Sequence, residues 1–370
     1  MHTIAGNLVR QAVLVAALAL APGARADWTF AMMGDTRGPK TTTTGVSPYL
    51  TNIAEKIATL NPEMVLVCGD LINGDYTNAT FTLNYAEQYA NWKTSMSSVF
   101  NYATGTGIPI YPVRGNHDNS CYSHAPITEL KQAYYDAFSP YVPTNGPHYS
   151  TTNNQVGFSY AFTHSNLTVV AADQYFYYDQ TPGESGYHDL ARAWVSEQFA
   201  QTNSSFKLLM AHTPMFMTEG DANAEHFFGN NAASFQTRSN FWNELGTNGV
   251  QLYLTGHLHN LSVSSTTNDY GHAIVQLLSG NGGAPLNAIT DHTCDAGVNL
   301  LHTNDTQYGF AFATVGSDRM TIDYYLLNPA DETWSQDSYS TTIFAVPEPS
   351  SVGLFLVGLL ALALRRRDKH

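Results

Sequence analysis

The sequence predicts a layered α/β domain whose second sheet is largely antiparallel. Over most of the chain, apolar runs of strand length alternate with helical patterns. After Asn260 the strand-like runs follow one another with no helical pattern between them. Alternation followed by strands alone is typical of a layered α/β protein. Several of the runs also stop at a polar cluster, as strands do at the ligand-binding edge of an open α/β sheet.

The predicted strands are short, apolar and bounded by Gly, Asp or Pro. In chain order they cover residues 28–33, 64–68, 110–113, 160–162, 167–172, 206–211 and 250–255. Helices are predicted between them, at residues 48–60, 85–100, 129–138, 189–201 and 241–248. Further strands are predicted at residues 273–279, 310–315 and 320–327. Because we find no internal repeat and no linker before about residue 331, we expect one domain over residues 27–330 and a linker over 331–345.

The first 26 residues are typical of an export signal. Arg10 provides a positive flank, an apolar run covers residues 12–21, and Ala24-Arg25-Ala26 fits the small-x-small site that signal peptidase cleaves. A short buried helix is the alternative interpretation, but the N-terminal position and the flanking residues favour the signal. We therefore expect residues 1–26 to be removed and the mature chain to begin near Asp27.

The C-terminal residues combine Val346-Pro347-Glu348-Pro349, an apolar run over residues 352–364, and Arg365-Arg366-Arg367. The run makes a helix of about 20 Å, which is short of the hydrocarbon core, and the basic cluster favours a cytoplasmic C-terminus. Residues 346–370 resemble the PEP-CTERM sorting signal of Gram-negative bacteria. The resemblance implies exosortase-type sorting machinery, transient membrane association through the C-terminal helix, and a destination in the periplasm, at the outer cell surface or in the extracellular matrix. An ordinary C-terminal membrane anchor is the alternative.

The composition indicates an acidic globular protein. The formal net charge is −14, and it is more negative without the two ends, which hold six of the 16 Lys and Arg residues but only two of the 30 Asp and Glu residues. Such a surface repels nucleic acid, so no nucleic acid polymer is expected as a partner. The abundance of aromatic residues excludes a disordered chain, and the length allows one large core.

Three cysteines allow at most one internal disulfide. Cys68 ends an apolar run and is expected to be a buried strand residue. Cys121 and Cys294 lie in polar stretches, and they would pair in an oxidising compartment if their Cα atoms lay within bonding distance.

Five polar clusters follow predicted strands at the point where the apolar run stops. Because ligand sites gather at the carboxyl ends of strands in open α/β sheets, we expect the five clusters to converge. Carboxylate, imidazole and amide oxygen together are the ligands of two divalent transition metals. The clusters are Gly34-Asp35-Thr36-Arg37, Gly69-Asp70-Leu71-Ile72-Asn73-Gly74, Gly115-Asn116-His117-Asp118, His212-Thr213-Pro214 and Gly256-His257-Leu258-His259.

This ligand set suits phosphoester hydrolysis. The reaction needs a hydroxide at neutral pH, neutralisation of charge on the phosphoryl oxygens, and protonation of the leaving group. Two metal ions about 4 Å apart supply the first two requirements. A carboxylate that bridges the ions holds that spacing.

In their order along the chain and in their residue types, the five clusters resemble the motifs of the calcineurin-like metallophosphoesterase superfamily, which includes purple acid phosphatases. The resemblance covers residues 27–327. It implies a four-layer sandwich of two stacked mixed β-sheets flanked by helices, with a centre of two divalent or trivalent metal ions (Fe, Mn or Zn). The implied ligands are Asp70 as the bridge, Asp35 and His259 for the first metal, and Asn116, His212 and His257 for the second.

The resemblance also implies residues that act on the substrate. His117 matches the family's outer histidine, which contacts the phosphate or protonates the leaving oxygen. Asp118 would orient the ring of His117 by a hydrogen bond, as carboxylates commonly do for catalytic imidazoles.

The first cluster departs from the family pattern, which usually has Asp-x-His there. Arg37 stands in place of the histidine, and arginine cannot bind a metal because it stays protonated. Purple acid phosphatases use a tyrosine three residues after the second-cluster aspartate, but that residue is Asn73, whose amide oxygen (or a water) would be a weak ligand. Two interpretations of Arg37 remain: it clamps a substrate phosphate, or it pairs with a nearby carboxylate.

These patterns predict an exported phosphomonoesterase or phosphodiesterase with a dinuclear metal centre that acts outside the cytoplasm. Nucleotides, sugar phosphates, phospholipid headgroups and phosphorylated exopolysaccharide all remain as substrate classes. The alternative is a surface-associated binding protein that keeps the fold with reduced or no turnover. A structural protein of the extracellular matrix is a third interpretation, which rests on the sorting signal alone.

Overall fold

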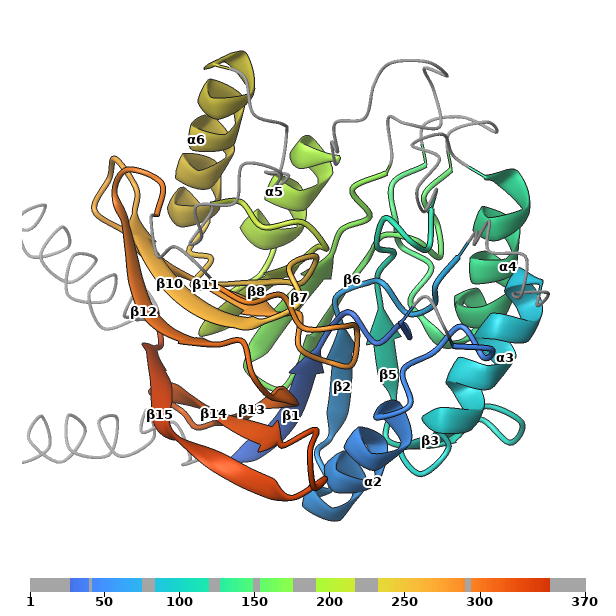
Figure 1. Ribbon diagram of the computed structural model, residues 1–370. Helices are drawn as coiled ribbons and strands as arrows, with labels where there is room; N and C mark the ends of the chain where they lie inside the picture. The colour runs from blue at the N-terminus through green and yellow to red at the C-terminus, as the bar shows by residue number, and fades with distance from the viewer. Residues whose placement is uncertain are drawn as a thin grey trace, which may run out of the picture.

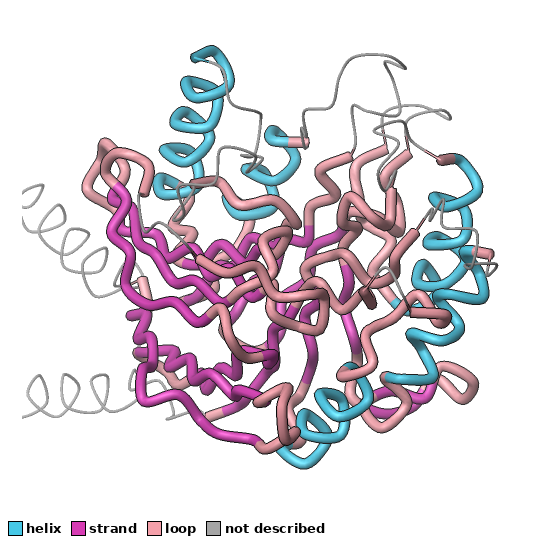
Figure 2. Tube along the Cα trace, viewed as in Figure 1, coloured by secondary structure: helices cyan, strands magenta, loops and turns pink. Residues whose placement is uncertain are grey.

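Figure 1 shows the computed structural model, which describes residues 27–39, 42–74, 84–119, 127–148, 154–175, 191–216, 232–289 and 294–346. Two β-sheets pack face to face, and helices cover their outer faces (Figure 2). The predicted fold class, two stacked mixed sheets flanked by helices, is confirmed.

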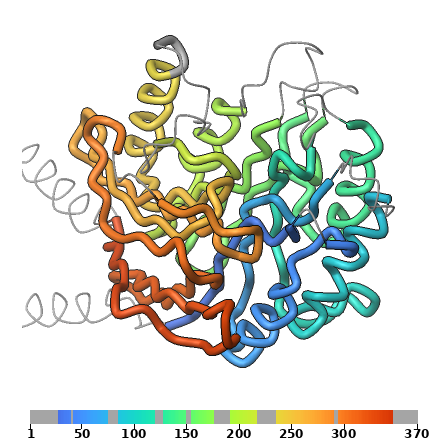
Figure 3. The backbone as a smooth tube through the Cα atoms, viewed as in Figure 1, coloured from blue at the N-terminus to red at the C-terminus, as the bar shows by residue number. Residues whose placement is uncertain are grey.

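The first sheet has six strands, and β1 joins its parallel half to its antiparallel half. Figure 3 shows the N-terminal strand, in blue, beside strands from the C-terminal part of the chain. From edge to edge the strands are β15 (Trp334–Phe344), β14 (Arg319–Leu327), β13 (Tyr308–Val315), β1 (Trp28–Met33), β2 (Met64–Val67) and β5 (Ile110–Pro112).

The second sheet has seven strands, of which β7, β8, β9 and β11 run parallel and the others antiparallel to their neighbours. From edge to edge they are β12 (Val298–Asn304), β10 (Leu261–Thr267), β11 (Ala273–Ser279), β9 (Leu252–Thr255), β8 (Phe206–Met210), β7 (Leu167–Ala171) and β6 (Tyr160–His164). A small hairpin of β3 (Phe100–Asn101) and β4 (Thr106–Gly107) lies apart from both sheets.

Helices form the two outer layers. The helices α2 (Leu50–Leu60), α3 (Tyr85–Ser95) and α4 (Thr128–Phe138) pack on the first sheet, and α5 (Arg192–Ala200) and α6 (Ala232–Thr247) pack on the second. A short 3-10 helix (Ser139–Tyr141) follows α4. The start of α3 is fixed by a capping box, in which the Asn84 side chain accepts from the Glu87 N–H and the Glu87 side chain accepts from the Asn84 N–H.

Alternation along β1 explains the layering. Phe30 and Met32 face the core between the two sheets, whereas Ala31 and Met33 face the core under α2 and α3. Because successive side chains of a strand point to opposite faces, a strand buried on both faces is apolar throughout.

The segment that we predicted as a linker, residues 331–345, is part of the folded domain. It contains β15, which pairs antiparallel with β14 over its whole length apart from one irregularity. The prediction was wrong because β15, at the edge of the sheet, is polar at most positions and therefore has no apolar run that would mark a strand.

Both predicted sorting segments, apart from Val346, lie outside the described residues, as does Cys121 of the candidate disulfide. Within the part of the chain that the structure describes, no helix is long and apolar enough to cross a membrane. Cys68 is buried at the end of β2, as predicted.

Candidate metal centre

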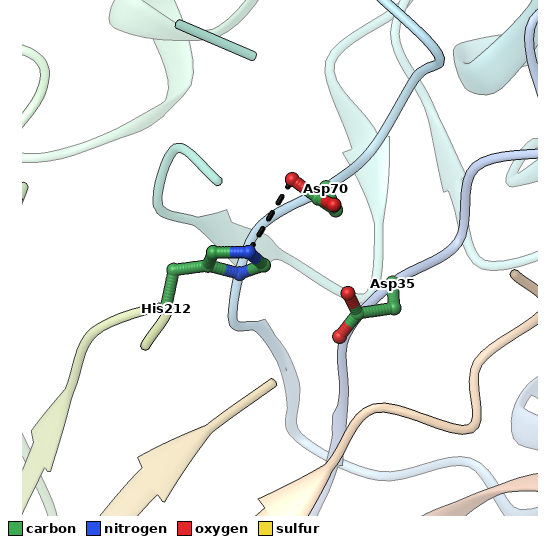
Figure 4. Close-up of side chains that lie close together, drawn as sticks. All are labelled: Asp35, Asp70 and His212. Atoms are coloured by element: carbon green, nitrogen blue, oxygen red, sulfur yellow. Dashed lines mark ion pairs between the residues drawn. The ribbon is translucent and has the colours of Figure 1, made fainter. Parts of the chain in front are cut away.

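The five polar clusters come together at one edge of the sandwich. The first three follow β1, β2 and β5 of the first sheet, and the last two follow β8 and β9 of the second. Figure 4 shows the side chains of Asp35, Asp70 and His212 close together on three separate segments. One ligand atom of each residue lies within 4.8 Å of the others. The site therefore lies where the two sheets meet, and both sheets contribute to it.

The turns that carry the site adopt backbone conformations that residues with a Cβ rarely occupy. Asp35, Asp70 and His257 have φ values of 55°, 54° and 73°, in a region that costs such a residue about 1–3 kcal/mol. The Asp35 N–H donates to the Gly69 carbonyl at 2.9 Å, which ties the first cluster to the second. A Cβ on Gly115 would collide with Asp70, so glycine is needed for the third cluster to approach the second.

Four ligand atoms group at what we call the second metal position, formed by Asp70, Asn116, His212 and His257. Asn116 Oδ1 lies 3.0 Å from both His212 Nε2 and His257 Nδ1, and His212 Nε2 lies 3.4 Å from Asp70 Oδ1. His212 Nδ1 donates to the Cys68 carbonyl at 2.8 Å, so the lone pair of a neutral ring faces the amide oxygen. Atoms that share one metal ion lie about 3 Å apart, so these residues fit a transition metal ion.

Two buried carboxylates place negative charge beside this group. Oδ1 of Asp35 has no hydrogen-bond partner among the described residues. Burial and then the charge of Asp70 raise the pKa of Asp35 well above its ordinary value. Burial alone would also raise the pKa of Asp70, but the neighbouring histidines, first His212, and the Arg37 guanidinium lower it well below the ordinary value. Such a buried carboxyl group is stabilised either by a proton, as in the metal-free protein, or by a nearby cation that takes the proton's place.

Arg37 lies at what we call the first metal position, formed by Asp35, Asp70 and His259. Its Nε is 3.4 Å from Asp70 Oδ2, and its Nη2 is 3.2 Å from His259 Nε2. His259 Nδ1 donates to the Pro285 carbonyl at 2.8 Å, so Nε2 accepts the hydrogen bond from Arg37. Burial and then Arg37 lower the pKa of His259 to about 3, which keeps the ring neutral. The structure thus pairs Arg37 with a nearby carboxylate, and the phosphate clamp stays a prediction.

His117 joins the third cluster, to which it belongs, to the second. Its backbone N–H donates to Asp70 Oδ1 at 2.9 Å, and its Nδ1 is 2.8 Å from the carbonyl oxygen of Asn73. Its Nε2 is 3.9 Å from Asp70 Oδ2. Burial and then Arg37 lower the pKa of His117 to about 4. Asn73 thus meets His117 through its backbone, while its side-chain Nδ2 donates to the Pro39 carbonyl at 3.4 Å.

Asp118 does not orient His117 as we predicted. Its Oδ2 accepts the backbone N–H groups of Leu71 and Gly115 at 3.1 and 2.9 Å, and its Oδ1 accepts the hydroxyl of Tyr89 at 3.0 Å. The carboxylate therefore braces the second and third turns, and the Asn73 carbonyl holds the imidazole instead. Burial and then a neighbouring aspartate raise the pKa of Asp118 to about 7.

The residues around this site match a known protein family. The model of the calcineurin-like phosphoesterases matches residues 29–261, which include all five clusters. The chain belongs to the calcineurin-like phosphoesterase family. A second model, the PEP-CTERM protein-sorting motif, matches residues 345–367. Both resemblances that the sequence indicated are confirmed.

Individual relatives agree with the family match. Tartrate-resistant acid phosphatase type 5 of Homo sapiens is 26% identical over 328 residues, which are 86% of this chain and 92% of the human protein. Purple acid phosphatase PPD1 from yellow lupin (Lupinus luteus) seeds has a TM-score of 0.58 at 15% identity, covering 87% of this chain and 55% of the lupin chain, so this chain spans about half of that enzyme. GAP50, the anchor in the inner membrane complex of Plasmodium, has a TM-score of 0.54 at 12% identity, covering 88% and 91%. At these identities the two structures establish the fold alone.

Two buried glutamines, which the family motifs did not include, hold the turn of the fourth cluster. Gln174 Oε1 accepts the backbone N–H groups of His212 and Thr213 at 2.8 and 2.7 Å. Gln276 Oε1 accepts the N–H of Met215 at 2.8 Å. The one sequence signal was the position of Gln174 just after a predicted strand, and Gln276 had none.

A buried ion pair, which the sequence analysis also missed, supports the third cluster. Arg114 Nη2 is 2.6 Å from Asp173 Oδ2, and its Nε is 3.3 Å from Oδ1. Both side chains are 0% exposed. Nη1 of Arg114 also donates to Asn119 Oδ1 at 3.2 Å, and the guanidinium lies over the Phe158 ring, 4.6 Å from its centroid. The pair thus anchors both ends of the turn that carries Asn116.

Proposed function

We propose that this chain is a metal-dependent phosphoester hydrolase, a phosphomonoesterase or phosphodiesterase, that acts outside the cytoplasm. The observation that carries the proposal is the meeting of Asn116 Oδ1 with His212 Nε2 and His257 Nδ1, each at 3.0 Å. The lone pairs of Asn116 Oδ1 and His212 Nε2 face each other there, and a cation stabilises such a meeting. Membership of the phosphoesterase family and the human acid phosphatase relative support phosphoester hydrolysis as the chemistry.

The proposed cofactors are divalent or trivalent ions of Fe, Mn or Zn. The sequence pattern predicts a dinuclear centre, and the second metal position has the geometry to hold an ion. The first metal position shares Asp70 and His259 with Arg37, so the proposal requires only the ion at the second position. When bound, an ion would supply hydroxide at neutral pH and neutralise charge on the phosphoryl oxygens.

His117 is proposed to protonate the leaving oxygen. Because its Nδ1 donates to the Asn73 carbonyl at 2.8 Å, the transferable proton would be on Nε2. Burial holds the pKa of His117 at about 4, and the negative charge of a bound phosphate would raise it. Arg37 would add a fixed positive charge that attracts the phosphate.

The proposal includes the cellular destination of the protein and its partners. The match to the PEP-CTERM motif supports export, handling by exosortase-type sorting machinery, and transient membrane association through residues 352–364. The periplasm, the outer cell surface and the extracellular matrix are the proposed destinations. The substrate is a phosphoester, and the net charge of −14 disfavours a nucleic acid polymer.

The test is hydrolysis of p-nitrophenyl phosphate and of bis(p-nitrophenyl) phosphate with Mn, Zn or Fe added, alongside elemental analysis of the purified protein. We expect activity that needs metal and that is lost in Asp70→Asn, and the preferred ester would separate a monoesterase from a diesterase. The matched control is Asp318→Asn, which changes an exposed aspartate far from the site and should leave activity unchanged.

Bound metal without turnover on either ester would instead support a surface-associated binding protein with reduced or no turnover. The same fold occurs in GAP50, the anchor in the inner membrane complex of Plasmodium, so the fold by itself does not imply turnover. Absence of both metal and turnover would refute the hydrolase and leave only the fold.

A further inference from the structure

Arg37 contacts the two atoms that the first metal position most needs. Its Nε is 3.4 Å from Asp70 Oδ2, and its Nη2 is 3.2 Å from His259 Nε2. Because His259 Nδ1 donates to the Pro285 carbonyl at 2.8 Å, the single lone pair of the ring is on Nε2 and points at Arg37. A lone pair that accepts this hydrogen bond cannot bind a metal ion at the same time.

The guanidinium is held in this place by the chain around it. Arg37 is only 7% exposed. Its backbone N–H donates to the Asp70 carbonyl at 3.0 Å, and its Nη1 donates to the Gly38 carbonyl at 3.4 Å. Its backbone also forms an isolated β-bridge with Val46. A surface arginine would swing away from an incoming ion, but this one is fixed at both its backbone and its head group.

The first metal position is also poor in other ligands. Arg37 replaces the histidine of the family pattern, and Asn73 replaces the tyrosine that purple acid phosphatases use. With His259 engaged, the carboxylates of Asp35 and Asp70 are the strong ligands that remain among the described residues, and the amide of Asn73 is at most a weak one. A metal ion between them would lie against a guanidinium of the same sign of charge. Both carboxylates also belong to the 4.8 Å cluster that contains a histidine of the second metal position, so they can serve an ion there.

We propose that the guanidinium of Arg37 takes the place of the first metal ion, so that this enzyme uses one metal ion and one fixed arginine. The inference rests on the proposed function, since the remaining ion is the one assigned there to the second metal position. The guanidinium balances the charge of Asp70 and offers N–H donors to a phosphate oxygen, but it cannot activate water. One ion and one side chain would therefore perform the tasks that two ions perform in the family.

The test is metal stoichiometry, which does not depend on turnover. The full-length protein is stripped with a chelator, reloaded with Mn²⁺, desalted and measured by elemental analysis and by electron paramagnetic resonance. We expect about one ion per chain, with the hyperfine pattern of an isolated ion. In Arg37→His, which restores the family's ligand and frees His259, we expect about two ions per chain and the pattern of a spin-coupled pair.

Two control variants sharpen the result. Arg37→Lys keeps the positive charge and should still bind about one ion, and Arg319→His removes an exposed arginine (57% exposed) and should match the wild type. About two ions in the wild-type protein would overturn the inference while leaving the proposed hydrolase intact. Absence of any bound ion in the wild type would refute both. The wild-type measurement decides the matter even if Arg37→His does not fold, and an unchanged count in folded Arg37→His would show that Arg37 does not exclude the ion.

Discussion

Asp173→Asn tests whether the ion pair behind the metal centre supports both the fold and the site. Arg114 and Asp173 are 0% exposed and joined by hydrogen bonds of 2.6 and 3.3 Å. The substitution keeps the size of the side chain but removes its charge. The Arg114 guanidinium then remains buried without a counter-ion, and the backbone turn that carries Asn116 loses its anchor.

The expected magnitude follows from the burial. Removing one partner of a fully buried ion pair costs about 3–5 kcal/mol, because the other charge is left uncompensated in a medium of low polarity. The amide oxygen of an asparagine can still accept one hydrogen bond from Arg114, so we expect about 3 kcal/mol, at the lower end of that range. A charge-free replacement of both partners, Arg114→Met with Asp173→Leu, should cost less than either single change.

The assay is urea unfolding of the metal-free protein, followed by tryptophan fluorescence. Each variant is compared with wild type provided that the free energy of unfolding falls with urea concentration at the same slope in both. The matched control is Asp318→Asn, which removes the carboxylate of an Arg–Asp pair that is 57% and 66% exposed. Water already solvates that pair, so no measurable change in the free energy of unfolding is expected. A cost for Asp173→Asn as small as that of the control would refute the claim that the buried pair supports the third cluster.

Three further predictions concern the site itself. His117→Ala should lower turnover on an ester with a poor leaving group about a hundredfold or more while sparing metal content; unchanged turnover would remove His117 from the mechanism. Gly115→Ala places a Cβ against Asp70 and should weaken metal binding about 10–100-fold, as measured by calorimetric titration. The control Gly316→Ala, whose added Cβ would meet its nearest atom at 3.1 Å, should leave the affinity unchanged, and equal affinities of the two variants would contradict the steric argument. The pKa of Asp118 is raised to about 7, so the folded metal-free protein keeps a proton that the unfolded chain loses near pH 4. The contribution of Asp118 to the free energy of unfolding should therefore fall as pH rises from about 4 to 7, by up to about 1.4 kcal/mol per pH unit. Urea unfolding of wild type and Asp118→Asn at several pH values measures that contribution as the difference between the two proteins, and a difference that does not change with pH would contradict the raised pKa.

The sequence predicted those elements whose pattern is local. Strand β1 is buried on both faces and is apolar at every position except Thr29, and its bounds were predicted correctly. By contrast β10, with Ser and Thr at most positions, reads as a polar loop until its pairing with β11 and β12 is known. Helix α6 begins at Ala232, well before the predicted start at residue 241. The prediction missed its first turns because they carry few apolar residues.

The residues of the candidate site likewise fall into those with a local sequence signal and those whose role depends on distant contacts. Each candidate ligand could be identified from its own turn, because a polar residue after an apolar strand is a local signal. The roles of Arg37 and Asp118 were not readable, since each depends on contacts across the fold: Arg37 with His259, and Asp118 with Tyr89. The sequence shows which polar residues follow the strands, whereas tertiary packing determines which atoms their side chains contact.

Backbone strain and unbalanced charge gather where the two sheets meet, and this argues for function independently of the family match. Half of the six described non-glycine residues with positive φ are the site residues Asp35, Asp70 and His257. The buried Asp35 Oδ1 without a partner lies there as well. Each feature alone destabilises the metal-free fold by about 1–3 kcal/mol, and a fold selected for stability alone would have placed an asparagine or a glycine at these turns. A bound cation offsets these costs together, because it satisfies the orphaned oxygen and attracts the carboxylates that the turns hold in place. The arrangement is therefore explained as a site shaped for a positive charge, part of which the chain itself supplies through Arg37.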